Sequence, residues 1–193
     1  NKLVAQIATG SLPDVFTVGA DLLDIMNKSG KAMDLAPHIA SDSHWNNVYP
    51  EGAFESKMMG DKLFYLPYEL FVTPVTYNKK LLKAAGYDEF PDNYDDFFKM
   101  CEAVTATGKV CTSQMTGKNG WTSMLWFSQA LVSAGGPDIY KKGLDDPAFV
   151  KAFEVMEKMY KYTTSDAIGA DAGVSGGHFL NERTAVFMNG PWF

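Results

Sequence analysis

The chain has 193 residues, of which 46% are apolar and 21% charged, a composition typical of a globular protein of one to one and a half domains. Its net charge is −6 and Arg183 is its single arginine, so no basic stripe is present that would bind a nucleic acid. The sequence predicts neither a signal peptide nor a membrane span, since no apolar run approaches the roughly 18 residues that a bilayer requires.

The first part of the chain predicts a helix, a strand and a second helix. Residues 1–10 carry apolar side chains at helical spacing and end on a glycine. The β-branched and aromatic run at 14–19 predicts a strand, and the apolar residues of 21–30 predict a helix that ends at Gly30. Because the chain opens within a helix and stops abruptly after Phe193, we expect a fragment of a longer protein.

The segment 62–77 is predicted to be extended almost throughout. Pro67 and Pro74 exclude a helix there, and two prolines in an extended run suit a sheet edge or a crossing between two lobes. We therefore expect the boundary between two lobes at about residues 69–76.

The second part of the chain alternates predicted helices and strands, which favours an α/β sheet with helices on both faces. Helices are expected at 79–85, at 94–107, at 123–134 and from Pro147 onward, with N-caps at Asn78, Asp92-Asn93, Thr122 and Asp146. Strands are expected at 110–115 and 185–188. In the last helix, we expect the buried face to contain Phe149, Phe153, Met156 and Tyr160.

The strand at 185–188 is a continuous apolar run and should be buried on both faces, as in a parallel sheet. Asn189-Gly190-Pro191 then turns the chain at the carboxyl end of the strand, where open α/β sheets bind their ligands. This position directs Trp192 toward a ligand site. The alternative is a tryptophan that caps the core below the turn.

Aromatic residues make up 13% of the chain, and Trp121 and Trp126 follow a turn or stand in the first turn of a helix. Sugar rings have apolar C–H faces and a fringe of hydroxyl groups, so their sites combine flat aromatic side chains with hydrogen-bonding ones. The tryptophans together with nearby polar residues therefore indicate sugar binding. Phe97, at helical spacing, is expected in the core.

Other chemistries have little support in the sequence. The glycines at 117 and 120 lack the spacing of a phosphate loop, and no serine stands in a Gly-x-Ser-x-Gly elbow. Adjacent acidic pairs stand at helix starts or in loops, where the helix dipole explains them. The histidines His38, His44 and His178 are scattered. We expect no catalytic residues, no cofactor and no metal.

Cys101 and Cys111 flank a turn that contains Gly108, and no further ligands stand at zinc spacing. If the protein is exported, a disulfide between them is plausible; two buried thiols are the alternative. We take the disulfide as the working prediction.

The chain resembles the extracellular solute-binding proteins of ABC sugar importers, the maltodextrin-binding-like family. Five ordered stretches carry the resemblance: ATGSLPDVF (8–16), KLFYLPYE (62–69), YNKKLLKAAGYDEFPDNYDDF (77–97), QALVSAGG (129–136) and FLNERTAVFMNGPW (179–192). It implies the two-lobed, periplasmic-binding-protein-like (type II) α/β fold. Residues 1–73 would then be part of the N-terminal lobe, and residues 74–193 most of the C-terminal lobe.

The same resemblance implies a ligand site between the lobes. Trp192 matches the family's stacking tryptophan, and the family's hydrogen-bonding glutamate falls on Phe71, with Glu69 two residues earlier. This departure argues against a maltodextrin ligand and leaves other sugars open. The remaining positions implied by the resemblance are Val18, Gly19 and Asp21 on the first lobe, and Asn119, Trp121 and, less strongly, Trp126 on the second.

The implied function is that of the substrate-binding component of a carbohydrate ABC importer, which closes on a sugar or oligosaccharide by hinge motion and performs no chemistry. Its partner would be the membrane permease, and its place the periplasm or the cell exterior, free or as a membrane-anchored lipoprotein. Two alternatives remain: a binding protein for another solute, such as glycerol phosphate or a polyamine, and a carbohydrate-active hydrolase.

Overall fold

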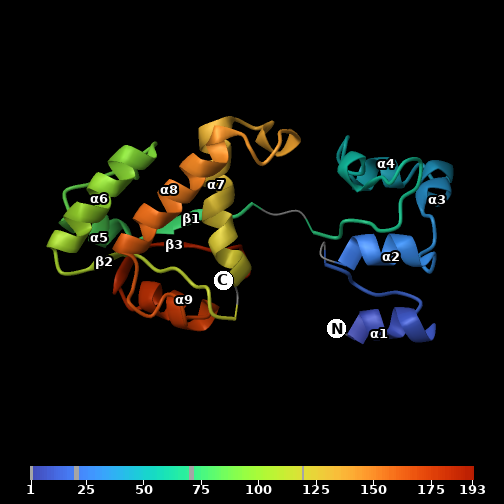
Figure 1. The fold of residues 1–193 in the computed structure, drawn as a ribbon, viewed down its shortest axis with the longest axis horizontal. Helices are drawn as coiled ribbons and strands as arrows, with labels where there is room; N and C mark the ends of the chain where they lie inside the picture. Colours follow the sequence, from blue (N-terminus) through green and yellow to red (C-terminus); the bar gives the residue numbers. More distant parts are fainter. Residues whose placement is uncertain (1, 20–21, 70–71, 119) are drawn as a thin grey trace. The chain divides into compact units, whose positions relative to one another are not determined.

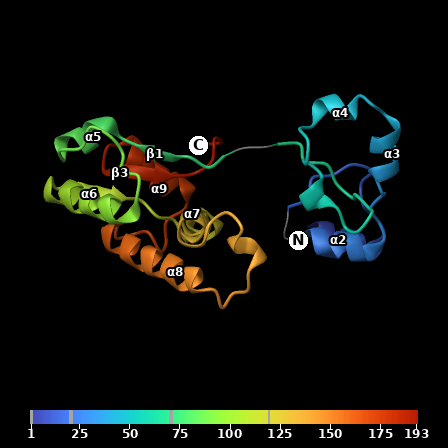
Figure 2. The ribbon, with the colours of Figure 1, turned by 90° about the horizontal axis from the view of Figure 1, so that it is seen from above.

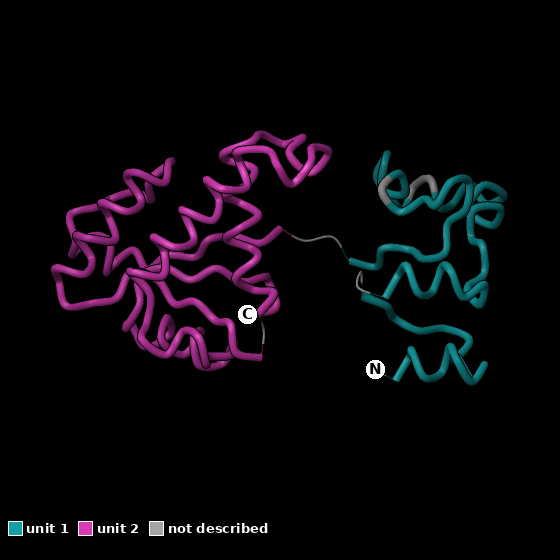
Figure 3. The backbone as a smooth tube through the Cα atoms, viewed as in Figure 1, with its two compact units in different colours: residues 1–70 teal, residues 71–193 magenta. Residues whose placement is uncertain are grey.

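The computed structural model describes residues 2–19, 22–69, 72–118 and 120–193, apart from the side chains of Asn46, Asn47 and Ser56. The chain divides into two compact units, residues 1–70 and 71–193 (Figure 3). The division falls between residues 70 and 71, within the segment 62–77 that the two prolines mark as extended.

In the first unit, the described residues form short helices connected by loops (Figure 1). Gly10 and Gly30 adopt left-handed φ values of 70° and 66° at the ends of the first two helices, which confirms both predicted helix ends. The helices are α1 (Lys2–Thr9), α2 (Leu23–Ser29), α3 (Ala36–Ser41), α4 (Trp45–Val48) and the 3₁₀ turn η2 (Glu55–Lys57).

The strand predicted at 14–19 is wrong for the residues that the structure describes there. Residues 11–18 are irregular, and the side chain of Val15 is 90% exposed. A strand needs a neighbour for its backbone hydrogen bonds, and within 2–19 and 22–69 the described β-pairing is the single bridge between Met59 and Lys62. The β-branched sequence alone is therefore not enough to form a strand here.

The core of the first unit is small. Its described buried apolar residues are Leu22, Met26 and Leu63. Asp34 ties two of its loops together, since its Oδ1 accepts hydrogen bonds from the amides of Ala36 at 3.0 Å and Leu63 at 3.1 Å. These two bonds, the one from Leu63 first, lower the pKa of the Asp34 carboxyl group.

The second unit is built on a three-stranded sheet with the order β1-β3-β2. The central strand β3 (Thr184–Met188) is buried at all five positions, as its apolar run predicts. It pairs antiparallel with β1 (Val75–Tyr77) and parallel with β2 (Val110–Thr112). Consequently β2 and β3 end at the same edge of the sheet.

Helices cover both faces of this sheet, as predicted (Figure 1). Val186 and Met188 pack with the helices that Figure 1 shows above the strands, and Phe187 faces Phe179 below, at a ring distance of 6.0 Å. The helices are α5 (Lys79–Ala84), α6 (Tyr94–Ala106), α7 (Ser123–Gly135), α8 (Pro147–Met159), α9 (Ala172–Leu180) and the 3₁₀ turns η3 (Gly120–Thr122), η4 (Ile139–Lys141) and η5 (Tyr160–Tyr162).

Three of the four predicted helix caps are confirmed. The side chains of Asn78, Asn93 and Asp146 accept hydrogen bonds from backbone amides at the starts of α5, α6 and α8. The fourth prediction, Thr122 for α7, is wrong, because Thr122 is itself helical and makes no side-chain cap. Its hydroxyl group instead donates to the carbonyl of Met115 at 2.9 Å.

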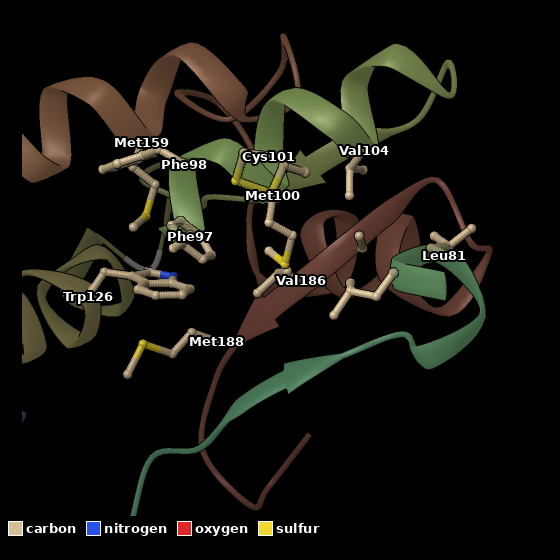
Figure 4. Close-up of a cluster of buried hydrophobic side chains, with 13 residues drawn as sticks. Leu81, Phe97, Phe98, Met100, Cys101, Val104, Trp126, Met159, Val186 and Met188 are labelled. Atoms are coloured by element: carbon tan, nitrogen blue, oxygen red, sulfur yellow. A yellow bond between two sulfur atoms is a disulfide. The ribbon is translucent and has the colours of Figure 1, made fainter. Parts of the chain in front are cut away.

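The main core lies between the sheet, α5, α6, α7 and α8 (Figure 4). Phe97 is buried, as predicted, and its ring lies 5.7 Å from that of Trp126. Helices α7 and α8 run side by side (Figure 2). The predicted face of α8 is partly wrong, because Phe153 is 63% exposed. The buried face instead follows Ala148, Ala152 and Met159.

Cys101 and Cys111 form a disulfide between α6 and β2 (Figure 4). Their Cα atoms are 4.9 Å apart, within the range that a disulfide spans, and both residues are fully buried. A bond that closes so short a loop stabilises a fold by about 2 to 3 kcal/mol, mainly by restricting the unfolded chain.

Candidate functional site: a tryptophan pair at the carboxyl edge of the sheet

Two tryptophans meet at the edge where the parallel strands β2 and β3 end. Trp121 stands in η3, beyond the loop that follows β2, and Trp192 stands in the turn after β3. Their ring centroids are 5.7 Å apart and their planes are inclined by 57°. The two residues remain 48% and 51% exposed, so both keep aromatic surface that a ligand can reach.

The turn after β3 holds Trp192 close to the backbone. The indole of Trp192 lies directly against Gly190, so that a Cβ atom at position 190 would overlap the ring atoms. Asn189 is buried, and its side-chain oxygen accepts a hydrogen bond from the amide of Gly190 at 2.9 Å. The amide of Phe193 donates to the carbonyl of Gly190 at 3.2 Å, which closes the turn.

The loop between β2 and Trp121 is held by hydrogen bonds to the start of α7 and to the segment before α9. Next to Trp121, the hydroxyl groups of Thr122 and Ser123 donate to the carbonyl of Met115 at 2.9 and 3.3 Å. The Ser123 hydroxyl also lies 3.2 Å from that of Tyr160. These bonds attach the start of α7 to the loop and to η5.

The loop itself packs against the segment before α9. Backbone amides of Thr116 and Gly117 donate to the carbonyls of Ala167 and Ala170 at 3.1 and 3.0 Å. A Cβ atom at Gly117 would overlap the backbone of Gly169 and Ala170, so this close approach requires glycine. The glycine at 117 therefore has a packing role.

Helix α9 connects the same loop to the sheet. Ser113 donates through its hydroxyl to the carbonyl of Ser175, and Ser175 donates to the carbonyl of Gln114, both at 2.8 Å. Nε2 of His178 in α9 is hydrogen-bonded to Oδ2 of Asp166, in the segment before α9, at 2.8 Å. The hydrogen bond from His178 is the main reason that the pKa of Asp166 is lowered. Sequence reasoning missed this pair, since nothing in the spacing of the two residues relates them.

The remaining predicted ligand positions fall in three groups. Val18, Gly19 and Glu69 belong to the first unit, where Val18 is partly buried and the other two are exposed. Trp126 is only 4% exposed and packs in the core of the second unit. Asp21, Phe71 and Asn119 lie outside the described residues.

A pocket of about 580 Å³ opens beside Trp126 in the second unit. Burial raises the pKa of Tyr94, one of its lining residues, to about 12. No sequence pattern predicts this pocket, because it forms where the loop before α6 meets α7. Its lining residues are Thr73, Val75, Phe90, Pro91, Asp92, Asn93, Tyr94, Phe97, Leu125, Trp126, Ser128, Gln129, Val132, Ser133 and Tyr140.

The tryptophan pair is suited to contact the apolar face of a ring. Within the described ranges, histidine, cysteine and acidic residues form no cluster of three or more that would hold a metal ion. No helix in that part of the chain is long and apolar enough to cross a membrane.

The whole chain, residues 1–193, matches the family model described as bacterial extracellular solute-binding protein. The chain therefore belongs to this family. Its curated relatives include a probable sugar-binding periplasmic protein of Mesorhizobium japonicum, 24% identical over 98% of this chain. Another is the diacetylchitobiose-binding protein of Streptomyces coelicolor, 24% identical over 99% of this chain. The chain spans about half the length of these relatives, 47% and 45%.

Solved structures share the fold. A chitin oligosaccharide-binding protein superposes with a TM-score of 0.83 at 23% identity, over 99% of this chain and 49% of its own. A solute-binding protein in complex with raffinose gives a TM-score of 0.72 at 21% identity, over 99% of this chain and 52% of its own. The two-lobed, periplasmic-binding-protein-like fold, present over about half of its usual length, is thus the fold of this chain.

Proposed function

We propose that this chain is part of the sugar-binding component of a carbohydrate ABC importer, and that the indoles of Trp121 and Trp192 contact the sugar. The observation that carries the proposal is the exposed tryptophan pair at the carboxyl edge of two parallel strands. Open α/β sheets bind their ligands at this edge, and indoles are the side chains best suited to stack on the C–H face of a sugar ring.

The relatives support a carbohydrate ligand. One is named a diacetylchitobiose-binding protein and another a galactooligosaccharide-binding protein. These names describe proteins of about twice this length, so the identity of the sugar is a matter for experiment. We keep Trp126 as a secondary candidate, because it lines a pocket although it is buried.

Residues of the first unit are proposed to complete the site. Val18, Gly19 and Asp21 would form one rim of the ligand site. Glu69 and Phe71, next to the boundary between the two units in the sequence, would provide further ligand contacts. Asn119 would add a hydrogen-bonding group beside Trp121. We further propose that residues 1–73 and 74–193 belong to the two lobes and that the ligand closes them by binding the closed state more tightly.

The partner in this proposal is the membrane permease, which would recognise the closed, sugar-bound form. The description of the family implies a location outside the cytoplasm. Whether the protein is free there or held at the membrane as a lipoprotein can be tested by extracting washed membranes with detergent and blotting both fractions.

A thermal-shift screen of the complete protein that carries this chain tests the proposal. The panel contains N,N′-diacetylchitobiose, raffinose, laminaribiose and galactose, with glycerol 3-phosphate and spermidine as the non-sugar alternatives. A ligand at about 100 times its dissociation constant stabilises the folded state by roughly 2.7 kcal/mol, which gives a clear rise in Tm. A rise with a sugar supports the proposal, and a rise with only the phosphate or the polyamine overturns the carbohydrate assignment.

A chromogenic glycoside assay separates binding from catalysis. We expect no release of the chromophore, since a solute-binding protein has no need to break a glycosidic bond. Hydrolysis would instead favour a carbohydrate-active enzyme, which uses two carboxylates about 5 to 10 Å apart.

A further inference from the structure

Helix α9 carries two glycines side by side in its interior, at 176 and 177. Glycine in a helix interior costs roughly 1 kcal/mol relative to alanine, because it loses more backbone freedom on folding. A helix that contains two such residues needs a separate reason for each of them. For Gly176, the structure provides this reason.

Gly176 is buried and lies directly against the ring of Phe193. A Cβ atom at position 176 would overlap ring atoms of Phe193, so the ring takes the space that any side chain would occupy. Gly177 differs, because a Cβ atom there would meet none of the described atoms within 4 Å. The two neighbouring glycines thus differ in the space at their Cβ positions, and Gly177 serves as a control for Gly176 in the same helix.

The ring of Phe193 fixes the turn that contains Trp192. It packs edge-on against Phe187 of β3, with centroids 4.7 Å apart. Its backbone amide bonds to the carbonyl of Gly190, the residue that the Trp192 indole covers. Phe193 is therefore held by α9 on one side and by β3 on the other, while Trp192 is the adjacent residue.

We propose that Gly176 is a positioning residue of the ligand site. Because Gly176 has no side chain, the Phe193 ring can pack against α9, and the ring in this position fixes the angle between the rings of Trp192 and Trp121. The inference rests on the proposed function, since it assigns the tryptophan pair to the sugar. Gly176 itself contacts the ring of Phe193 and acts only through it. A side chain at 176 would displace the ring and with it the turn, because the ring occupies the space that a Cβ atom would need.

The test compares Gly176→Ala with Gly177→Ala in the complete protein. The probe is whichever sugar of the four-sugar panel raises the Tm of the wild-type protein most, and calorimetry measures its Kd. We expect Gly176→Ala to weaken binding by about tenfold, since stacking depends on the placement of the ring. Gly177→Ala should stay within about twofold of the wild-type Kd. Because both substitutions replace a helical glycine by alanine, the helix propensity of alanine would not separate them.

Phe193→Ala completes the experiment. In this background the ring is gone, so adding Gly176→Ala should change the Kd by less than about twofold. Four proteins are also melted without sugar: the wild type, Gly176→Ala, Phe193→Ala and the variant that combines the two substitutions. Gly176→Ala should raise the Tm in the Phe193→Ala background, where the helix gains alanine without a clash, and should raise it less or lower it when Phe193 is present.

Two results would overturn the inference. One is a Gly176→Ala protein with the wild-type Kd, and the other is an equal rise in Tm in both backgrounds. If none of the four sugars binds the wild-type protein, the proposed function falls and the positioning role falls with it. The melting comparison then still decides whether the Phe193 ring occupies the space at Gly176, so the two failures are distinguishable.

Discussion

The indole rings of Trp121 and Trp192 lie 5.7 Å apart although 71 residues separate them in the chain, counted from position 121 to position 192. The parallel pairing of β2 and β3 produces this proximity, because it brings the segments that follow both strands to one edge of the sheet. About half of each indole remains exposed, and this is the aromatic surface that the proposed sugar contact would cover.

Replacing Trp192 by alanine should weaken sugar binding by roughly thirtyfold or more, equivalent to about 2 kcal/mol, because stacking on one ring face is lost. Calorimetry on the complete protein measures this change. The Tm should fall little, since Trp192 is half exposed.

Trp126→Ala is the contrasting variant for that experiment. Its side chain is only 4% exposed and packs on Phe97, so truncation should cost about 3 to 5 kcal/mol of stability, as for a core aromatic residue. Unchanged sugar affinity together with a large loss of stability in the Trp192 variant would show that Trp192, too, is a core residue.

The bond between Cys101 and Cys111 should be present in the protein purified without reductant. Alkylation of the denatured, unreduced protein should then label neither thiol, and mass spectrometry reads the result. Replacing both cysteines by alanine should lower stability by about 2 to 4 kcal/mol, because the loop constraint and some buried packing are lost together. Full labelling of both thiols before reduction would contradict the disulfide.

The hydrogen bond between His178 and the carboxylate of Asp166 should make stability depend on pH in the acidic range. The hydrogen bond from His178 keeps the pKa of Asp166 below its usual 3.8. A carboxyl group with a lowered pKa in the folded state stabilises the fold above its unfolded-state pKa, and this contribution disappears as the pH falls through the folded-state value.

Asp166→Asn should therefore be less stable than the wild-type protein at pH 7. The difference should begin to shrink below about pH 3.8, where the carboxyl group of the unfolded wild-type chain takes up its proton, and should disappear below the lower pKa of the folded state. Urea denaturation at pH 7 and pH 3 measures it. Asp138→Asn is the control, since it removes an exposed ion pair with Lys141 that should contribute little. An equal deficit of the Asp166 variant at both pH values would contradict this account.

The second unit should be the more stable part of the chain. It contains the three-stranded sheet and both large buried clusters, whereas the first unit buries three apolar residues in its described part. Limited proteolysis should cut first within residues 1–70 and leave a resistant fragment that begins close to residue 71. Early cleavage inside α6 or α8 would show the reverse order of stability.

Several local features of the second unit could be predicted from the sequence. The caps at Asn78, Asn93 and Asp146 and the buried strand β3 were predictable, because short-range hydrogen bonds and an unbroken apolar run decide them. The sequence also predicted that Trp192 stands in the turn after a buried strand. These features depend on neighbours within a few residues, which is the range over which sequence patterns are informative.

Contacts between distant residues could not be predicted, because they depend on how the elements pack. The run at 14–19 has the composition of a strand but no described partner in its unit, so it stays irregular. The buried face of α8 differs from the predicted one, because packing against α7 decides which side is covered. Three contacts join residues from different parts of the chain: the Trp121–Trp192 pair, the hydrogen bond between Asp166 and His178, and the packing of the Phe193 ring on Gly176. No local pattern encodes such contacts, since they exist only once the sheet has brought its edges and helices together.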